Sequence, residues 1–179
     1  NHVCLHQTVI GLEAKKQLRV VEMGSTPGGH ALEIRAALTG FLVQGGDAGP
    51  DPELRVVTRR HPTDLEIEDL RFAMSVCRHV KSNAIVLAQG GATTGVGAGQ
   101  MSRVESVRIA VRRAGERAAG SVMASDAFFP FPDGIAEAQR AGVVAVIQPG
   151  GSVKDAAVIE EADRHGMAMV LTGRRHFRH

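Results

Sequence analysis

The chain has 179 residues, of which 44% are hydrophobic and 22% are charged, and its formal net charge is +2. This size suffices for one domain with its own core, and the balanced charge without a long basic run argues against a dedicated nucleic-acid binder. The two cysteines, Cys4 and Cys77, form no CxxC pair, and no apolar run approaches the roughly 20 residues of a membrane span. We therefore expect a cytoplasmic protein that contacts neither nucleic acid nor membrane. Because the sequence starts at Asn1 without an initiator Met, we also expect a piece of a longer polypeptide.

The first part of the chain predicts three strands and one well-marked helix. Apolar runs rich in β-branched residues at 18–23, 40–43 and 54–58 predict the strands. Thr63 and Glu66 form a capping-box pattern, which marks the start of a helix. Apolar residues then recur towards one face of this helix, namely Leu65, Leu70, Ala73, Met74, Cys77 and Val80.

The segment at 81–103 is rich in glycine and reads KSNAIVLAQGGATTGVGAGQMSR. It predicts a strand at 84–88, a glycine turn, a short strand, a second glycine-rich turn and then a helix over 100–117. The glycines of the second turn let the backbone approach a neighbouring group closely, but their spacing is neither GxGxxG nor a P-loop. A tight structural turn is the favoured interpretation, and an anion at the start of the following helix is the alternative.

Two polar residues of this segment each have two interpretations. Asn83 stands just before an apolar strand, where a buried carboxamide must find partners, although a turn or cap residue is commoner there. Arg103 lies in the first turn of a helix, the end that is electrostatically less favourable for a cation. This position slightly favours an external anionic partner, while a solvated surface arginine is the default.

The segment at 125–134, SDAFFPFPDG, holds three of the six phenylalanines of the chain within four positions. Pro130 and Pro132 exclude the interior of a helix or of a central strand, so the segment predicts a rigid loop. One interpretation is a hydrophobic plug in which Asp133 caps a short helix over 135–140. The other is a ligand site with stacked rings, and composition does not choose between them.

The last part of the chain predicts strands at 143–148 and 167–172 around a helix that begins at a capping Ser152 and stops near Gly166. Pro-Gly-Gly between strand and helix places backbone N–H groups where α/β folds usually bind ligands. The tail at 173–179, GRRHFRH, is either frayed or held against the body by the strand before it. Strands that alternate with helices predict a layered α/β fold with parallel pairing in this half.

A metal site finds little support in the sequence. His2, Cys4 and His6 alternate as H-x-C-x-H, but no fourth ligand has convincing spacing. The zinc deaminase signature is absent, so we expect no zinc, and the absence of a G-x-S-x-G elbow argues against a serine hydrolase.

Five stretches follow one another in the order and spacing of one family: KSNAIV, GVGAGQMSRV, SDAFFPFPDG, IQPGGS and RHFRH. They resemble the C-terminal part of the AICAR transformylase domain of the bifunctional AICAR transformylase/IMP cyclohydrolase family. The looser ELRVVT and GFLVQGGD also fit, so the resemblance covers about 15–179, and the whole chain, 1–179, is identified as the C-terminal portion of that domain. The upstream half and the cyclohydrolase domain are not in this sequence.

The resemblance implies a fold, an assembly and a reaction. The fold would be a three-layer α/β/α, cytidine-deaminase-like arrangement with a mixed sheet and no zinc. The family works as a homodimer with active sites at the interface. Its enzyme transfers a formyl group from 10-formyltetrahydrofolate to the 5-amino group of AICAR ribotide, giving FAICAR in purine (IMP) biosynthesis.

On the AICAR side, the resemblance implies four residues. Asn83 would contact AICAR near the reacting amine and act as a catalytic residue, and Phe128 would pack on the substrate. Arg175 would bind AICAR, and His179 would orient the catalytic groups. In the aromatic loop, Phe129 and Phe131 are expected to face the core.

On the folate side, the resemblance implies contacts from Arg103 and Asp133 and a pocket wall from Val104 and Pro130. Asp126, together with the carboxyl-terminal segment, is similar to part of a potassium site seen in some members. Potassium is therefore expected as an occasional cofactor beside the folate co-substrate.

The sequence departs from the family in two places. The Lys-His-x-Asn-Pro motif that carries the catalytic lysine-histidine pair does not occur, and Gln89 stands where many relatives have lysine. We therefore expect this chain alone to be nearly inactive, with the rest of the transformylase/cyclohydrolase polypeptide supplying the pair. The competing hypothesis is a non-catalytic α/β nucleotide-binding module, and a weaker one is a metal-dependent deaminase.

Overall fold

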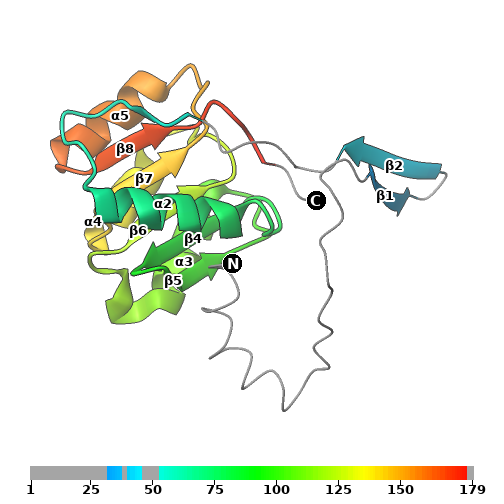
Figure 1. Cartoon of the computed structure of the whole chain (residues 1–179), viewed down its shortest axis with the longest axis horizontal. Helices are drawn as coiled ribbons and strands as arrows, with labels where there is room; N and C mark the ends of the chain where they lie inside the picture. Colours follow the sequence, from blue (N-terminus) through cyan, green and yellow to red (C-terminus); the bar gives the residue numbers. More distant parts are fainter. Residues whose placement is uncertain (1–31, 38–39, 46–52, 177–179) are drawn as a thin grey trace, which may run out of the picture. The chain divides into compact units, whose positions relative to one another are not determined.

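The computed structural model describes residues 32–37, 40–45 and 53–176. The chain divides into two units, Asn1–Asp51 and Pro52–His179 (Figure 1). In the first unit, β1 (Leu32–Ala37) and β2 (Gly40–Gly45) pair as an antiparallel hairpin. The predicted strand at 40–43 is therefore confirmed, β1 was not predicted, and the strand predicted at 18–23 lies outside the described residues.

The second unit is built on a six-stranded sheet of order β3-β8-β7-β6-β4-β5. β6, β7 and β8 run parallel, whereas β4 is antiparallel to both β5 and β6, and β3 is antiparallel to β8. The mixed sheet and its parallel half are thus confirmed. The strands are β3 (Arg55–Val56), β4 (Ile85–Gln89), β5 (Ala92–Gly97), β6 (Val122–Ser125), β7 (Ala145–Gln148) and β8 (Ala168–Leu171).

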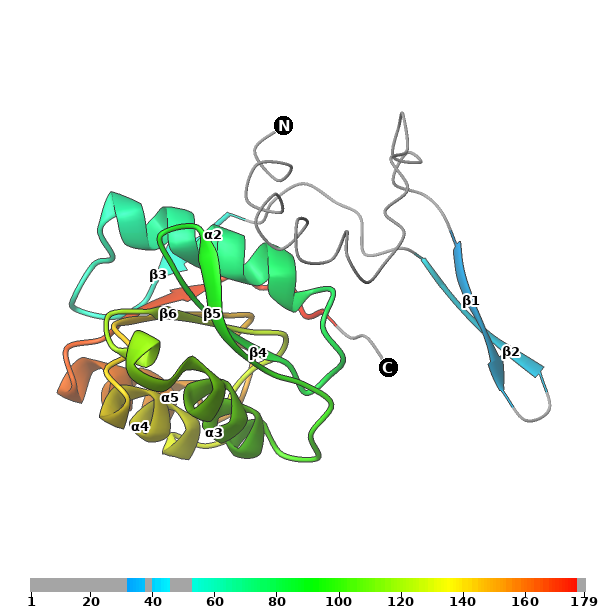
Figure 2. The same cartoon turned by 90° about the horizontal axis from the view of Figure 1, so that it is seen from below.

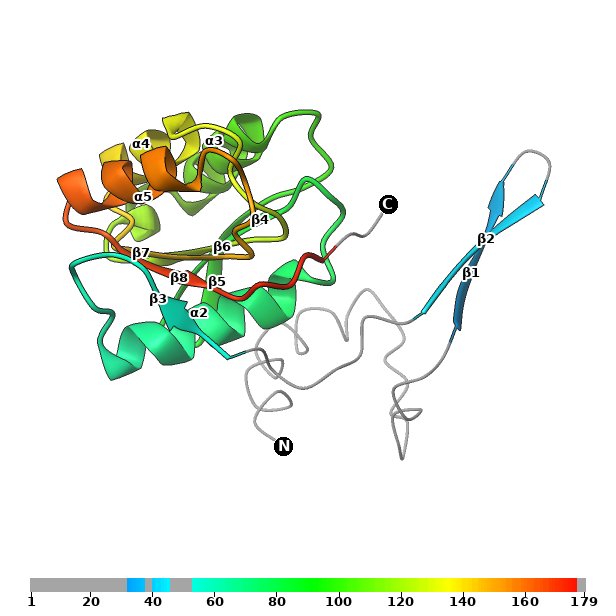
Figure 3. The same ribbon diagram turned by 90° about the horizontal axis from the view of Figure 1, so that it is seen from above.

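Helices cover both faces of this sheet and make three layers (Figures 2 and 3). One face carries α2 (Asp64–Cys77). The other carries α3 (Arg103–Ala114), α4 (Asp133–Arg140) and α5 (Asp155–Arg164), with a short 3-10 turn, Gly115–Ala118, after α3. The three-layer α/β/α architecture is confirmed, and the cytidine-deaminase-like detail of the fold stays a prediction.

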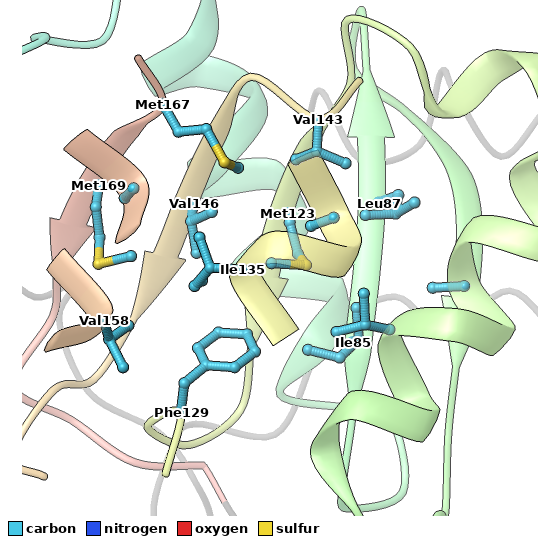
Figure 4. Close-up of a cluster of buried hydrophobic side chains, with 14 of the residues drawn as sticks. Ile85, Leu87, Met123, Phe129, Ile135, Val143, Val146, Val158, Met167 and Met169 are labelled. Atoms are coloured by element: carbon cyan, nitrogen blue, oxygen red, sulfur yellow. The ribbon is translucent and has the colours of Figure 1, made fainter. Parts of the chain in front are cut away.

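Two apolar cores lie on opposite faces of the sheet because alternate side chains of a strand point to opposite sides. In β4, Ile85 and Leu87 join the core under α3, α4 and α5, whereas Val86 and Ala88 join the core under α2. Figure 4 shows the first of these cores, in which the ring of Phe129 packs with aliphatic and methionine side chains. No helix in the described ranges is long and apolar enough to cross a membrane.

Helix α2 begins where the capping box predicts. The Thr63 hydroxyl accepts from the Glu66 N–H, and the Glu66 carboxylate accepts from the Thr63 N–H. Leu65, however, is 74% exposed and does not belong to the buried face. Leu65 precedes Leu70 by five residues, so in a helix of 3.6 residues per turn the two side chains point about 140° apart. Val80 lies beyond the end of the helix, which stops at Cys77.

Helix α5 begins later than predicted. Ser152 does not cap it, because the Ser152 hydroxyl accepts from the Lys154 N–H at 3.1 Å and Lys154 occupies the cap position. The Asp155 carboxylate accepts from the Gly151 N–H at 2.7 Å. Both polar side chains therefore accept hydrogen bonds from main-chain N–H groups at the Pro-Gly-Gly turn, and Ser152 does not cap the helix.

The glycines at 95 and 97 have a packing role. A Cβ atom on Gly95 or on Gly97 would collide with the backbone of Ala110 or of Ser106 in α3. These two glycines therefore allow helix α3 of the same chain to pack closely on β5. Gly95 and Gly97 lie in β5, so the predicted tight turn is wrong at these two positions, where the glycines serve the packing of a strand against a helix.

Candidate functional site

A cavity of about 420 Å³ opens at the edge of the sheet where β6 and β8 end. β4 runs antiparallel to β6, with Ile85 opposite Ser125, so the residues just before β4 reach the same edge. We call this cavity the substrate pocket. Its lining brings together seven of the predicted site residues, namely Asn83, Arg103, Val104, Phe128, Pro130, Asp133 and Arg175.

The Asn83 carboxamide is fixed from two sides. Its Oδ1 accepts from Arg103 Nη2 at 2.8 Å, and its Nδ2 donates to the Gln100 carbonyl at 2.9 Å. Its own main-chain carbonyl accepts from the Ser106 hydroxyl at 2.9 Å. This pattern determines which end of the amide carries oxygen and leaves a second Oδ1 lone pair and a second Nδ2 proton for a ligand.

Arg103 is buried, with 7% of its side chain exposed, so the default of a solvated surface arginine is wrong. Its Nη1 donates to the carboxylate of Asp126, which is fully buried, and to the Ser125 hydroxyl at 2.7 Å. The anion that compensates the charge of Arg103 at the helix start is thus the Asp126 carboxylate of the same chain. A buried ion pair of this kind is costly to break, about 3–5 kcal/mol when one partner is removed.

The aromatic loop buries one phenylalanine ring in the core and leaves another exposed at the pocket. Phe129 is 1% exposed in the core, and its N–H donates to Gln148 Oε1 at 3.0 Å. Phe131 is 58% exposed and lines the pocket, so the expectation that it faces the core is wrong. Pro130 separates the two rings in a turn that sends one inward and the other outward.

The carboxyl-terminal segment is docked as far as His176. The His176 N–H donates to the Asp126 main-chain carbonyl at 2.9 Å, and His176 is 5% exposed. The Arg175 guanidinium lies over the Phe128 ring, 4.5 Å from its centroid. Such a cation–π contact is worth about 0.5–1 kcal/mol where it is exposed to water. His179, the predicted orienting residue, lies outside the described residues.

Asp133 occupies the first turn of α4, which begins at this residue and so two residues earlier than predicted. Its Oδ1 accepts from the Gly134 N–H at 2.8 Å, and the side chain is otherwise exposed at the rim of the pocket. The carboxylate is therefore both a local turn element and an accessible hydrogen-bond acceptor for a ligand.

Asp126 does not fit a potassium ion through its carboxylate. Oδ1 accepts from Arg103, and Oδ2 accepts from the Ser82 hydroxyl at 2.5 Å. A cation at this carboxylate would face the Arg103 guanidinium at short range. Within the part of the chain that the structure describes, no three His, Cys, Asp or Glu side chains form a metal-binding group. His2, Cys4 and His6 fall outside that part.

Sequence reasoning missed several residues that hold the site. Ser82 and Ser125 are each next in sequence to a predicted residue, which is the only signal that could have suggested them. Gln148 is the single polar residue of the apolar strand β7, and its Oε1 holds the aromatic loop by accepting a hydrogen bond from the Phe129 N–H. Burial of a lone polar side chain is itself a signal that it has a fixed partner.

Comparison with known proteins identifies a family for the chain. Residues 5–113 match the model of the AICARFT/IMPCHase bienzyme family. The chain is 58% identical over 173 residues to the "Bifunctional purine biosynthesis protein PurH" of Sorangium cellulosum (strain So ce56), covering 94% of this chain and 33% of that protein. It is 54% identical over 172 residues to the protein of the same name from Desulfitobacterium hafniense (strain DSM 10664 / DCB-2), with the same coverage.

A third similar protein, with the same name, comes from Brucella ovis (strain ATCC 25840 / 63/290 / NCTC 10512) and is 54% identical over 180 residues, covering 93% of this chain and 34% of that protein. The chain thus spans about a third of the length of the curated relatives it matches. The family model covers more than half of the chain, and residues from four of the five motifs that suggested the resemblance line one pocket. The chain therefore belongs to the AICARFT/IMPCHase bienzyme family.

Proposed function

We propose that this chain forms part of the active site of an AICAR transformylase, which moves a formyl group from 10-formyltetrahydrofolate to the 5-amino group of AICAR ribotide. The product would be FAICAR, in the route to IMP. The observation that carries the proposal is the Asn83–Arg103–Asp126 network, because it presents one oriented amide to a pocket with an aromatic wall.

The chemistry needs a group of this kind. The amine of AICAR is conjugated with its ring and the neighbouring carboxamide, so it is a weak nucleophile. Its nitrogen attacks the formyl carbon, the bond from that carbon to folate N10 breaks, and one amine proton ends on N10. The free Oδ1 lone pair of Asn83 can accept a hydrogen bond from the amine and direct the nitrogen lone pair at the formyl carbon.

The same orientation serves the transition state. As the amine attacks, negative charge develops on the formyl oxygen and requires a donor that is already in place. The second Nδ2 proton of Asn83 is a donor of fixed direction, since the first is held by the Gln100 carbonyl. Arg103 acts through Asn83 and is therefore a positioning residue for this step.

The other residues that line the substrate pocket are assigned to one or the other of the two substrates. We assign AICAR to Phe128 and Arg175, where a flat heterocycle can pack on the ring and an anionic group can meet the cation. We assign the folate to Val104, Pro130 and Asp133, which offer apolar surface and an accessible carboxylate. The Arg103 guanidinium is engaged by Asp126, so its contact with folate would come from its pocket-facing edge and not from an unpaired charge.

The proposal includes the rest of the polypeptide. The Lys-His-x-Asn-Pro motif does not occur in this chain, so the catalytic pair would come from elsewhere in the complete protein, which we take to be a cytoplasmic homodimer. His179 would complete the catalytic groups. A potassium requirement is not part of the proposal, because Asp126 is already engaged by Arg103 and Ser82.

The test compares formyl transfer by the 179-residue chain with transfer by the complete polypeptide, in a spectrophotometric assay of tetrahydrofolate formation from purified AICAR ribotide and 10-formyltetrahydrofolate. We expect turnover from the complete protein and almost none from the chain alone. Comparable rates from the two would refute the division of the site. A complete protein that binds AICAR ribotide without transferring formyl would instead favour the nucleotide-binding module.

A further inference from the structure

Gln148 is a fully buried amide at the end of β7, the strand that lies between β6 and β8 in the parallel half of the sheet. The other residues of this strand, Ala145, Val146 and Ile147, are apolar and equally buried. Burial of an amide costs free energy unless its oxygen and nitrogen find partners, so a leucine here would serve the core at least as well. A buried amide at this position therefore calls for a role beyond filling the core.

The two ends of the Gln148 amide have different partners. Oε1 accepts from the Phe129 N–H at 3.0 Å, whereas Nε2 donates to the Met169 sulfur at 3.3 Å, and a thioether is a weak acceptor. The main chain of Gln148 is itself fixed, because its carbonyl accepts from the Thr172 N–H at 2.9 Å and the residue lies opposite Leu171 of β8. The stronger bond of this amide thus joins the aromatic loop to the middle of the sheet.

The aromatic loop has little other main-chain support. Its two prolines have no N–H to donate. Among the described residues, the Phe129 N–H is the one main-chain group of residues 128–131 that forms a hydrogen bond, and its acceptor is Gln148. The Phe129 ring is packed in the core, where Gly134 leaves it room. Phe129 therefore attaches the loop to the body of the protein in two ways, through its ring and through its N–H.

The two residues beside Phe129 are assigned to different substrates. Phe128, assigned to AICAR, lies under the Arg175 guanidinium, and Pro130, assigned to the folate, follows Phe129 directly. A shift of the main chain at Phe129 would therefore move the walls for both substrates together. Gln148 does not belong to the described residues that line the substrate pocket, so any effect on the substrates has to pass through the loop.

We propose that Gln148 is a positioning residue for formyl transfer: it holds the Phe129 N–H and thereby places the walls for AICAR and for the folate at the same time. The inference rests on the proposed function, since it concerns the same two substrates. Without the acceptor oxygen, a buried N–H would be left unpaired, and the loop would relieve this by turning the N–H towards water. Each substrate would then bind more weakly, because binding would also have to order the loop.

The experiment uses the complete polypeptide with Gln148→Leu, which removes both hydrogen-bonding atoms of the side chain and keeps it large and apolar. Val146→Ala, in the same strand and the same core as the Phe129 ring, is the control for a general loss of stability. Met169→Leu is the control for the other end of the amide, because it removes the sulfur and nearly keeps the volume. Steady-state assays give kcat and the KM values of AICAR ribotide and 10-formyltetrahydrofolate, and urea denaturation gives the stability of each variant.

The expected signature is a joint rise of the two KM values. We expect Gln148→Leu to raise each KM about tenfold, as for the loss of one buried hydrogen bond, and to change kcat by less than about threefold. The reason for the small effect on kcat is that Asn83 is oriented by Arg103 and the Gln100 carbonyl and not by the loop. Both control variants should keep the two KM values of the unaltered protein, whatever their effect on stability.

If Gln148→Leu does not fold, Gln148→Asn makes the same prediction, because it keeps an amide and draws the oxygen back by one methylene group. Unchanged KM values in a folded Gln148 variant would overturn the proposal and leave the bond as a support of the core alone. So would a rise in only one of the two KM values, or an equal rise in Val146→Ala. These results would leave the proposed function intact, whereas a complete, unaltered protein that transfers no formyl group would overturn the proposed function and this inference together.

Discussion

The guanidinium of Arg103 links the stability of the site to its chemistry. One nitrogen, Nη1, donates to the buried Asp126 carboxylate and the Ser125 hydroxyl, and the other, Nη2, donates to Asn83 Oδ1. A lysine has one ammonium group and cannot reproduce these two directions at once. The orientation of Asn83 therefore depends on a residue that the pocket itself largely conceals.

Replacement of Asn83 tests the role of that amide. In the complete enzyme, Asn83→Ala should lower kcat by about 10²–10³, the usual cost of losing one preorganised donor at a developing oxyanion, while KM for the folate changes little. Gln100→Ala is a matched control, because Asn83 contacts only the main-chain carbonyl of Gln100. Steady-state kinetics measures both variants. If Asn83→Ala turned over as fast as Gln100→Ala, Asn83 would not be a catalytic residue.

Replacements of Phe129 and Phe131, which flank Pro130, should differ in their effect on the stability of the protein. Phe129→Ala opens a cavity in the core and should lower the free energy of unfolding by about 3–5 kcal/mol. Phe131→Ala removes an exposed ring and should change stability by no more than about 0.5 kcal/mol. Urea denaturation followed by circular dichroism measures both. Equal losses in the two variants would contradict the opposite orientations of these rings.

At the scale of the element, the aromatic loop was predictable as a rigid loop and not as a site. Its two prolines excluded regular structure, but no local pattern distinguishes Phe129, which packs in the core, from Phe131, which lines the substrate pocket. That difference is set by contacts distant in sequence. Gln148, at the end of β7, holds the Phe129 N–H, and Gly134 leaves room for the Phe129 ring.

Helix α2 offers the reverse case, since its start follows from four residues of sequence. Thr63→Ala removes the acceptor for the Glu66 N–H and should destabilise the protein by about 1 kcal/mol. Ser75→Ala on the same helix is the control, because Ser75 bonds only within the helix, to the Arg71 carbonyl. Chemical denaturation compares the two. A Thr63→Ala protein as stable as the control would show that the capping box adds nothing.

The capping box also predicts a dependence on pH. Burial alone would raise the pKa of Glu66, but hydrogen bonds from Arg60 and from the Thr63 N–H outweigh it and lower the pKa below its ordinary value of 4.5. The unfolded chain then takes up the proton more readily, so the contribution of Glu66 to stability is present above about pH 4.5 and is lost as the pH falls through the folded-state pKa. The stability advantage of the unaltered protein over Glu66→Gln should therefore shrink below about pH 4.5, and an advantage that stays constant in acid denaturation series would contradict this.

At the scale of the whole molecule, strand order brings the site together. β6, β7 and β8 are parallel and end at one edge, where the aromatic loop, the Pro-Gly-Gly turn and the segment before His176 follow them. β4 is antiparallel to β6 and begins at that edge, which adds Asn83. Ligand sites at the carboxyl ends of parallel strands are a general property of such sheets.

All the described residues of the two apolar cores lie after Asp51, which predicts that the second unit folds by itself. A polypeptide of residues 52–179 should unfold cooperatively, with a urea midpoint close to that of the full 179-residue chain. Circular dichroism and amide hydrogen exchange measure this. A non-cooperative transition, or exchange without protection in β4 and β6, would show that the second unit needs residues 1–51.

Features that depend on neighbours along the chain were predictable without the structure. The capping box predicted the start of α2, apolar runs predicted most strands, and five motifs in register predicted the family. It did not predict β6, whose four residues become a strand by pairing with β4 and β7 on either side.

The burial of Arg103 on Asp126 and the position of Phe131 at the substrate pocket became known only from the folded chain. The difference comes from how far apart in the sequence the interacting residues lie. Caps and periodicity act over a few residues, whereas these contacts join segments that meet only after the sheet has formed and its strands have brought their ends to one edge.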